Sequence, residues 1–473
     1  MGRRDDVVTP DSWMPRGEAL CSDSHPPLAV WQGIPGESCL VHVYAPGNNR
    51  GLARWEKAVR QPHPHRVDPP CERYSVCGGC PWMHMDAEGQ RSARLDLVRA
   101  AYAEYGLQAH APTELRASPD GLAGYRHLAK FAVGRSDRGN PRVGAFGRST
   151  RNVVSIPDCP VITPVLREAM HTVAHLVIEQ DIWPYDPEKQ KGVLRYVVMR
   201  QSRATGKLLV TLVGARKSPK FEDLALALTQ KLGSVAGVHL HVNRSPGNAL
   251  FEAGEDGGIP TVRLEGDRHI EEHVAGLRLP IGAGDFFQTN PAVAELIIRD
   301  LEEWIPADVA VVDLYSGVGG LSLAAARRAG WALGVEVVET AVNRARGAAS
   351  LNSVPAEFLV GEVVEVLPEI RRRLSGRQPM VVVNPARRGL EPGVIDGILA
   401  LAPQRLVYIS CNPISQARDL GALVERGFTV VHTRAYDMFP NTPHVEVMAV
   451  LSGPGGAPQA SARPPRRRVV RKQ

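Results

Sequence analysis

The chain has 473 residues, which is more than one ordinary hydrophobic core accommodates, so we expect about two to four domains. Its apolar content of 44% is sufficient for packed globular domains, and no long uncharged apolar run indicates a membrane span. The formal net charge of +6 is compatible with a polyanionic partner, and no hydrophobic signal segment opens the sequence, so we expect a cytoplasmic protein that does not contact membranes.

The N-terminal segment, residues 1–66, is rich in short apolar stretches. Two of them, at 28–31 and 39–44, are separated by a turn that contains glycine and proline. Short strands interrupted in this way are typical of small β-barrels, and we predict an OB-like barrel for this segment.

Four of the seven cysteines form a pattern typical of a metal site. Cys71, Cys77 and Cys80 are closely spaced, and Cys159 lies farther along the chain between aspartate and proline. Clustered thiols in a chain with no export signal indicate metal ligation rather than a disulfide framework. Four thiolates suit either zinc or an iron-sulfur cluster, and the spacing does not choose between them.

A helix is predicted over residues 87–105, ending before a glycine. From residue 125 to about 281 the pattern then mixes strands and helices, which indicates an α+β region containing hairpins. The clearest of these predicted elements are strands at 194–199 and 208–212 and helices at 165–179 and 222–232.

The string YRHLAKF at residues 125–131 interleaves aromatic and basic side chains, and Arg135, Arg142, Arg148 and Arg151 follow it. Stacking combined with positive charge is typical of single-stranded RNA recognition. The alternative is a basic sheet face that only contacts solvent.

Beyond about residue 309 the rhythm changes to apolar strands separated by segments of helix length. This alternation predicts a doubly wound, mostly parallel α/β sheet. A basic tail, residues 454–473, follows a stretch rich in glycine, proline and alanine and is predicted to be disordered. The expected sheet strands are 309–314, 332–335, 380–383 and 406–409, with two late strands around Thr429 and Val447.

The string DLYSGVGG at residues 313–320 begins on the first of these strands and turns through three glycines into a predicted helix. Glycines let the backbone approach a ligand closely, and Glu336 ends the next strand where a ribose hydroxyl pair would lie. Together they predict a nucleoside cofactor. The spacing departs from the dinucleotide fingerprint because Ser322 stands at its third glycine, so S-adenosylmethionine fits better than NAD.

Two later strand ends carry candidate chemistry. Asn384 opens the loop NPARRG, and its amide can contact a cofactor or a base edge. The loop also suggests methylation of an exocyclic amino group, although Arg387 stands where that motif usually has an aromatic residue. Cys411 ends the strand 406–410, where its thiol is either a nucleophile at the ligand edge of the sheet or an ordinary buried cysteine.

Five motifs in order give the sequence a specific resemblance. They are DFFQTNP at 285–291, DLYSGVGG at 313–320, NPARRG at 384–389, SCNP at 410–413 and DMFPNTPHVE at 437–446. With these motifs the chain resembles the bacterial RNA uracil-C5 methyltransferases that use S-adenosylmethionine. The asparagine at 384 and the first string are most similar to the branch that modifies 23S ribosomal RNA.

The resemblance implies a role for each matched residue. Cys411 would be the nucleophile and Glu446 the base, and the four cysteines would hold a [4Fe-4S] cluster. The cofactor S-adenosylmethionine would be contacted by Gln288, Tyr315, Gly320, Glu336, Glu362 and Asn384.

The resemblance also implies a domain order and a partner. We expect a TRAM-like RNA-binding barrel at 1–66, a central α+β domain with the cluster and RNA contacts at 67–285, and a Rossmann-like class I methyltransferase domain at 286–453. The protein is expected to act as a monomer on RNA, with 23S rRNA preferred and transfer RNA as the alternative. A non-catalytic RNA-binding or assembly factor is the alternative from a different functional class.

Overall fold

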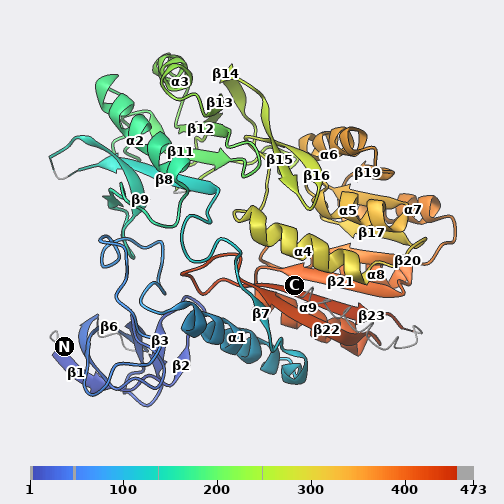
Figure 1. Cartoon of the computed structure of the whole chain (residues 1–473), viewed down its shortest axis with the longest axis horizontal. Coiled ribbons are helices and arrows are strands. Elements are labelled where there is room, and N and C mark those ends of the chain that lie inside the picture. The colour runs from blue at the N-terminus through green and yellow to red at the C-terminus, as the bar shows by residue number, and fades with distance from the viewer. Residues whose placement is uncertain (1–3, 46–48, 137, 248, 455–473) are drawn as a thin grey trace, which may run out of the picture.

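The structure, a computed structural model, describes residues 4–45, 49–136, 138–247 and 249–454. Figure 1 shows a small β unit at the N-terminus (blue), a central mixed unit (green) and a C-terminal α/β unit (orange and red). In the described part of the chain, no helix combines the length and the apolar character needed to span a membrane. The predicted basic tail lies outside the described residues, apart from Pro454.

Six strands form the N-terminal sheet, and the two strands predicted there are confirmed as β4 and β5. Trp31, which ends β4, has the Arg148 guanidinium 3.8 Å from its ring centroid and the Tyr74 ring at 5.9 Å. Both partners belong to the central part of the chain, so this sheet is docked against it. The strands are β1 (Arg4–Val8), β2 (Ser12–Trp13), β3 (Ala19–Cys21), β4 (Leu28–Trp31), β5 (Cys39–Ala45) and β6 (Gly51–Ala58), in the spatial order β1-β5-β6-β4-β3-β2.

The cysteine-bearing loop leads into helix α1 (Ala87–Ala103), which is two residues shorter than predicted. The Asp86 carboxylate accepts a hydrogen bond from the Gly89 amide at 2.8 Å and so caps the first turn. A short 3-10 helix, η1 (Gln108–His110), and strand β7 (Leu115–Arg116) follow.

The central sheet has seven strands in the order β10-β9-β8-β11-β12-β13-β14. The predicted hairpin is confirmed, because β11 and β12 pair antiparallel across the turn at 204–206. The predicted helices are confirmed as α2 (Pro164–Glu179) and α3 (Lys220–Lys231), which pack on the sheet. The strands are β8 (Leu128–Arg135), β9 (Pro141–Phe146), β10 (Val153–Val154), β11 (Leu194–Gln201), β12 (Leu208–Gly214), β13 (Val235–Val242) and β14 (Val262–Gly266).

A separate hairpin, β15 (His269–Val274) and β16 (Leu277–Gly282), connects this sheet to the C-terminal unit. That unit is built on an eight-stranded sheet in the order β19-β18-β17-β20-β21-β23-β22-β7. The first five are parallel and β23 is antiparallel to both of its neighbours. Its strands are β17 (Ala310–Leu314), β18 (Ala332–Glu336), β19 (Ala356–Val360), β20 (Pro379–Val383), β21 (Arg405–Ser410), β22 (Thr429–Tyr436) and β23 (Glu446–Ser452), together with β7.

Helices cover both faces of this sheet, as a doubly wound fold requires. Alternate residues of the central strands point to opposite faces, so Val312 belongs to a core cluster that includes residues of α1, α7, α8 and α9, and Val311 to one that includes residues of α4 and α5. The predicted doubly wound α/β fold is thereby confirmed. The helices are α4 (Pro291–Trp304), α5 (Gly320–Ala329), α6 (Glu339–Asn352), α7 (Val363–Leu374), α8 (Val394–Leu401) and α9 (Pro413–Glu425).

Strand β7 pairs in parallel with β22, although it precedes the central sheet in sequence. Helix α1 likewise packs against α9. Figure 1 shows α1 running beside the edge of the C-terminal sheet. The segment that follows the cysteines is therefore part of the packing around that sheet, and the proposed domain limits at 285 and 286 remain predictions.

Candidate active site and a cysteine-lined cavity

The first side of the candidate site is the turn from β17 to α5. Gly317 and Gly319 have positive φ angles of 53° and 88°, a conformation that favours glycine. A Cβ at Gly319 would also lie 3.0 Å from the Ala345 and Phe358 side chains. The turn is therefore tight, and it lies where the strand order reverses between β17 and β20, the usual place for a ligand in such sheets.

Glu336 lies at the end of β18 and faces this turn, as expected. One of its carboxylate oxygens accepts a hydrogen bond from the Gly317 amide at 3.0 Å, and the other accepts from the Val338 amide at 3.0 Å. The Gly361 amide in turn donates to the Glu336 carbonyl, which brings the exposed Glu362 to the same edge of the sheet.

Asp313, the acid before the glycines, is fully buried at the end of β17. One carboxylate oxygen accepts a hydrogen bond from the Ser322 hydroxyl at 2.5 Å, while the other, Oδ1, has no hydrogen-bond partner among the described residues. Burial raises the pKa of Asp313 to about 7, and the nearby Glu336 charge acts in the same direction. Ser322, which stands where the dinucleotide fingerprint has its third glycine, thus hydrogen-bonds to a buried acid.

Tyr315 has a positive φ of 71°, which is unusual for a residue other than glycine. Its hydroxyl donates a hydrogen bond to Glu391 at 2.9 Å, so the ring is held between the glycine turn and the loop after β20. Asn384, half-buried, opens that loop directly after β20. Tyr315, Gly320, Glu336 and Asn384 therefore lie at one edge of the sheet, with Glu362 at its margin.

The second side of the site is formed by Cys411 and Glu446. Ser410 pairs with Val447 in the antiparallel ladder of β21 and β23, so the next positions in register are Cys411 and Glu446. Cys411 is half-buried and Glu446 is only 2% exposed. The antiparallel strand thus carries a carboxyl group to the thiol at the strand exit.

Burial disfavours the charged form of both groups. Burial raises the pKa of Cys411, and the Glu446 carboxylate raises it further. Burial also raises the pKa of Glu446 to about 8. Near neutral pH the pair is therefore held mainly in neutral form.

Arg387 opposes both effects, because its guanidinium lowers the pKa of Cys411 and of Glu446. Its backbone is fixed from the Cys411 side: the Asn412 side-chain Nδ2 and the Ser415 hydroxyl donate to the Arg387 carbonyl at 2.7 and 3.0 Å. In the sequence, Arg387 is notable only because it stands where a related motif has an aromatic residue. Its effect on the Cys411 thiol could not be predicted from the sequence.

Gln288 lies shortly before α4 and lines a small separate cavity with Arg200 of β11 and Glu272 of β15. The preceding turn is held by Arg200, which donates to the carbonyls of Asp285 and Phe287 at 3.0 and 3.4 Å. Arg344 of α6 forms an ion pair with Asp285 as well. Between these anchored residues Phe286 is 75% exposed, so a rigid turn presents an aromatic ring to solvent beside Gln288.

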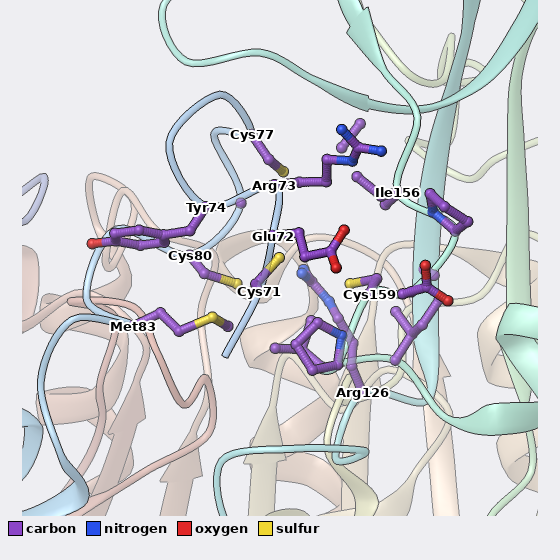
Figure 2. A pocket seen from close by; sticks show the side chains of 18 of the residues that line it. Cys71, Glu72, Arg73, Tyr74, Cys77, Cys80, Met83, Arg126, Ile156 and Cys159 are labelled. Carbon is purple, nitrogen blue, oxygen red and sulfur yellow. The ribbon is translucent and has the colours of Figure 1, made fainter. Parts of the chain in front are cut away.

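The four predicted metal ligands do come together. Cys71, Cys77, Cys80 and Cys159 line one cavity of about 120 Å³. Figure 2 shows their sulfur atoms gathered around this space, with Arg126 and Arg73 beside them. Burial raises the pKa of Cys71 and Cys77, and that of Cys80 to about 12, so the thiols need a positive ligand to ionise there.

The four thiols are not arranged around one point. Within the described ranges, no three histidine, cysteine or acidic side chains come close enough to hold one metal ion. The four thiols instead surround a volume of several atoms. Four soft sulfur donors suit either zinc or an iron-sulfur group.

The chain is similar to a known protein family and to several known proteins. The family described as tRNA (Uracil-5-)-methyltransferase matches residues 281–453. An uncharacterized RNA methyltransferase of Gloeobacter violaceus is 33% identical over 428 residues, which are 90% of this chain and 91% of the relative. One from Geobacter sulfurreducens is 33% identical over 88% of this chain and 84% of the relative.

A solved structure is also similar over nearly the whole chain. It is the Pyrococcus abyssi tRNA (uracil-54, C5)-methyltransferase in complex with S-adenosyl-L-homocysteine. The two chains are 26% identical with a TM-score of 0.75, and the match covers 94% of this chain and 100% of the other.

Proposed function

This chain belongs to the family of S-adenosylmethionine-dependent RNA uracil-5 methyltransferases, and we propose that it forms 5-methyluridine in 23S rRNA through a covalent adduct with Cys411. The observation that carries the proposal is the pairing of a thiol and a buried carboxyl group beside a glycine-rich cofactor turn. A binding module has no need of that combination.

The chemistry explains why a thiol is required. Uracil C5 is a poor nucleophile, and addition of a nucleophile at C6 gives C5 the electron density for methylation. Cys411 is the candidate for that addition, because a thiolate is strongly nucleophilic and can leave again. S-adenosylmethionine supplies the methyl group as an electrophile.

Release of the product needs a base. Glu446 is proposed to remove the C5 proton, so that elimination restores the C5=C6 double bond and frees Cys411. Its pKa of about 8 lies near working pH, which suits a group that must accept and return a proton. Arg387 favours the charged form of both side chains and so supports each step in turn.

The residues proposed to hold S-adenosylmethionine lie around the glycine turn. Glu336 already accepts two backbone hydrogen bonds there, and its position at the end of β18 suits a ribose hydroxyl pair. The remaining proposed contacts are Gln288, Tyr315, Gly320, Glu362 and Asn384.

The cysteine-lined cavity is proposed to hold a [4Fe-4S] cluster through Cys71, Cys77, Cys80 and Cys159. Support comes from the four converging thiols and the size of the space between them. The role proposed for it is structural, pinning the loop around 71–82 onto the central sheet. Zinc is the weaker alternative.

RNA is proposed to reach the site as an unpaired or flipped uridine, because C6 is inaccessible in a stacked helix. The expected stacking by Tyr125 and Phe131 is wrong, because both rings are buried in the core at 1% exposure. Arg126 and Lys130 of the same string are proposed to supply positive charge, and the exposed Phe286 a surface for stacking. We expect the N-terminal sheet to add RNA affinity, and we expect the enzyme to work as a monomer in the cytoplasm.

The RNA class is the open part of the proposal. Asn384 favours the 23S rRNA branch, whereas the family description and the similar solved structure name tRNA. Mapping 5-methyluridine in both RNAs from cells lacking the gene decides this. We expect a mark to vanish from 23S rRNA and to return with the wild-type gene but not with Cys411→Ala. Loss from tRNA alone would make tRNA the substrate, and no loss from either RNA would contradict the proposed activity.

A further inference from the structure

We propose that Arg94 of α1 is a positioning residue for the reaction, which fixes the loop 437–444 and thereby sets the place of Glu446. This inference rests on the proposed function, because it concerns the step assigned to Glu446. It is carried by a set of buried contacts between two segments about 345 residues apart.

Arg94 gathers three backbone carbonyls of the loop. Its Nε donates to the carbonyls of Thr442 and His444 at 3.1 and 3.3 Å, and its Nη2 donates to that of Phe439 at 3.2 Å. Arg94 is fully buried, with an exposed fraction of 0%. Nη2 also donates to the Gln90 side chain of α1 at 3.3 Å, and Nη1 has no hydrogen-bond partner among the described residues. The three bonds to the loop tie it directly to α1.

The charge of Arg94 is balanced at the start of the same loop. Its Nη2 lies 3.2 Å from Oδ1 of Asp437, and both side chains are buried. Removing one member of a buried pair leaves the other uncompensated, so the contact ties the conformation of the loop to α1.

A second anchor lies one helical turn before Arg94. The Gln90 side chain accepts from the Asn441 amide at 2.8 Å and donates to the Asn441 side chain at 3.1 Å. The Trp82 amide donates to the Asn441 carbonyl at 3.0 Å. Asn441 has a positive φ of 65°, so the loop is tightly bent where these groups hold it.

The anchored loop leads directly to the base. His444, the last residue that Arg94 holds, is two residues before Glu446, the first residue of β23. Tyr436, which ends β22, pairs with Glu446, so the loop closes a hairpin whose open end carries the carboxyl group. Displacing a reacting group by about 1 Å can lower a rate by roughly 100-fold, and Arg94 is placed to prevent such a displacement.

The same contacts connect the base to the cysteine loop. Trp82 is two residues after Cys80, and the Arg94 guanidinium lies 5.6 Å from the Trp82 ring centroid. Helix α1 therefore joins the cysteine-lined cavity and the active site through one buried path.

The test compares Arg94→Lys with Arg99→Lys on the same helix. Lysine keeps the charge but offers one nitrogen, which cannot serve three carbonyls spread over two guanidinium nitrogens. Arg99 is exposed and forms an ion pair with the exposed Asp96 of the same helix, so its variant controls for any arginine replacement on α1. Each variant is assayed for kcat, for KM toward S-adenosylmethionine and for covalent enzyme-RNA adduct on denaturing gels, beside wild type and Glu446→Gln.

We expect Arg94→Lys to lower kcat at least 10-fold, to leave KM for S-adenosylmethionine within twofold and to accumulate adduct as Glu446→Gln does. Arg99→Lys should behave as wild type. If Glu446→Gln accumulates adduct but Arg94→Lys has an unchanged kcat, or loses turnover without accumulating adduct, the inference is overturned. If Glu446→Gln turns over normally, the proposed base is wrong and the inference falls with it. Should Arg94→Lys fail to fold, Asp437→Asn is judged by the same criteria.

Discussion

Cys411 and Glu446 face each other across the end of an antiparallel strand pair, one step beyond the paired residues Ser410 and Val447. The thiol ends the last parallel strand of the doubly wound sheet, and the carboxyl group begins the antiparallel strand beside it. Glu446 is buried, and its carboxylate adds to the effect of burial in raising the pKa of the Cys411 thiol. This relationship gives the account its first measurable consequence.

The stability of the protein should depend on the ionisation of Glu446. Its pKa is raised from 4.5 to about 8 by burial, so between these values the folded state binds a proton that the unfolded state has lost. Stability therefore falls as pH rises through this window, by up to about 5 kcal/mol for a shift of this size.

Glu446→Gln removes the carboxyl group whose ionisation lowers the stability of the folded protein at high pH. Thermal melts should show the variant gaining stability over wild type as pH rises from 5 to about 9, with little difference at the acidic end. Glu425→Gln, at the exposed end of α9, serves as the control and should follow wild type. A constant difference between variant and wild type at every pH would contradict the buried, protonated carboxyl group.

Arg387 should control how readily the Cys411 thiol ionises. Its charge lowers the pKa of Cys411, so Arg387→Met should move alkylation of Cys411 by iodoacetamide to higher pH. Mass spectrometry of the peptide containing Cys411 separates this thiol from the others. Arg388→Met, one residue away and paired with Glu391, should leave the profile in place. Equal shifts for both variants would show a general charge effect instead.

Glu336 should matter for cofactor affinity. Its carboxylate organises the glycine turn through the Gly317 amide and faces the expected ribose. We expect Glu336→Gln to weaken binding of S-adenosyl-L-homocysteine at least 10-fold by calorimetry, a loss of about 1.4 kcal/mol. Glu339→Gln, exposed in the first turn of α6, provides the matched control. Unchanged affinity for Glu336→Gln would place the nucleoside elsewhere.

The cysteine-lined cavity should carry iron and sulfide. An anaerobic preparation is expected to be brown with a broad absorbance in the visible blue, and Cys77→Ser or Cys159→Ser should lose both the colour and the bound iron. Cys21→Ser, buried in the N-terminal sheet, should keep them. Zinc found in place of iron and sulfide would refute the cluster.

The strands of the C-terminal sheet were predictable because their side chains are buried on both faces. The predicted strands 309–314 and 406–409 correspond to β17 and β21 with differences of one residue at the ends. The glycine turn and Glu336 were also predictable, because positive φ and the position after a strand are local properties. The thiol at the exit of β21 was visible for the same reason.

Long-range contacts were not predictable in this way. Nothing in the periodicity of α1 indicates that Arg94 reaches the loop 437–444, since an arginine among other charged helix residues usually contacts solvent. The pairing of β7 with β22 was missed because two residues carry no strand pattern. Arg387 was visible in the sequence, but its effect on Cys411 depends on how two loops meet.

The most direct test of the account follows a methyl group from S-adenosylmethionine into RNA. The purified protein is incubated with labelled S-adenosylmethionine and RNA from cells lacking the gene, and the nucleosides are separated and identified by mass. We predict that the wild-type protein forms labelled 5-methyluridine and that Cys411→Ala forms at least about 1,000-fold less, as expected when a covalent nucleophile is removed. Formation of 5-methyluridine by Cys411→Ala at a rate near that of wild type would contradict the central claim.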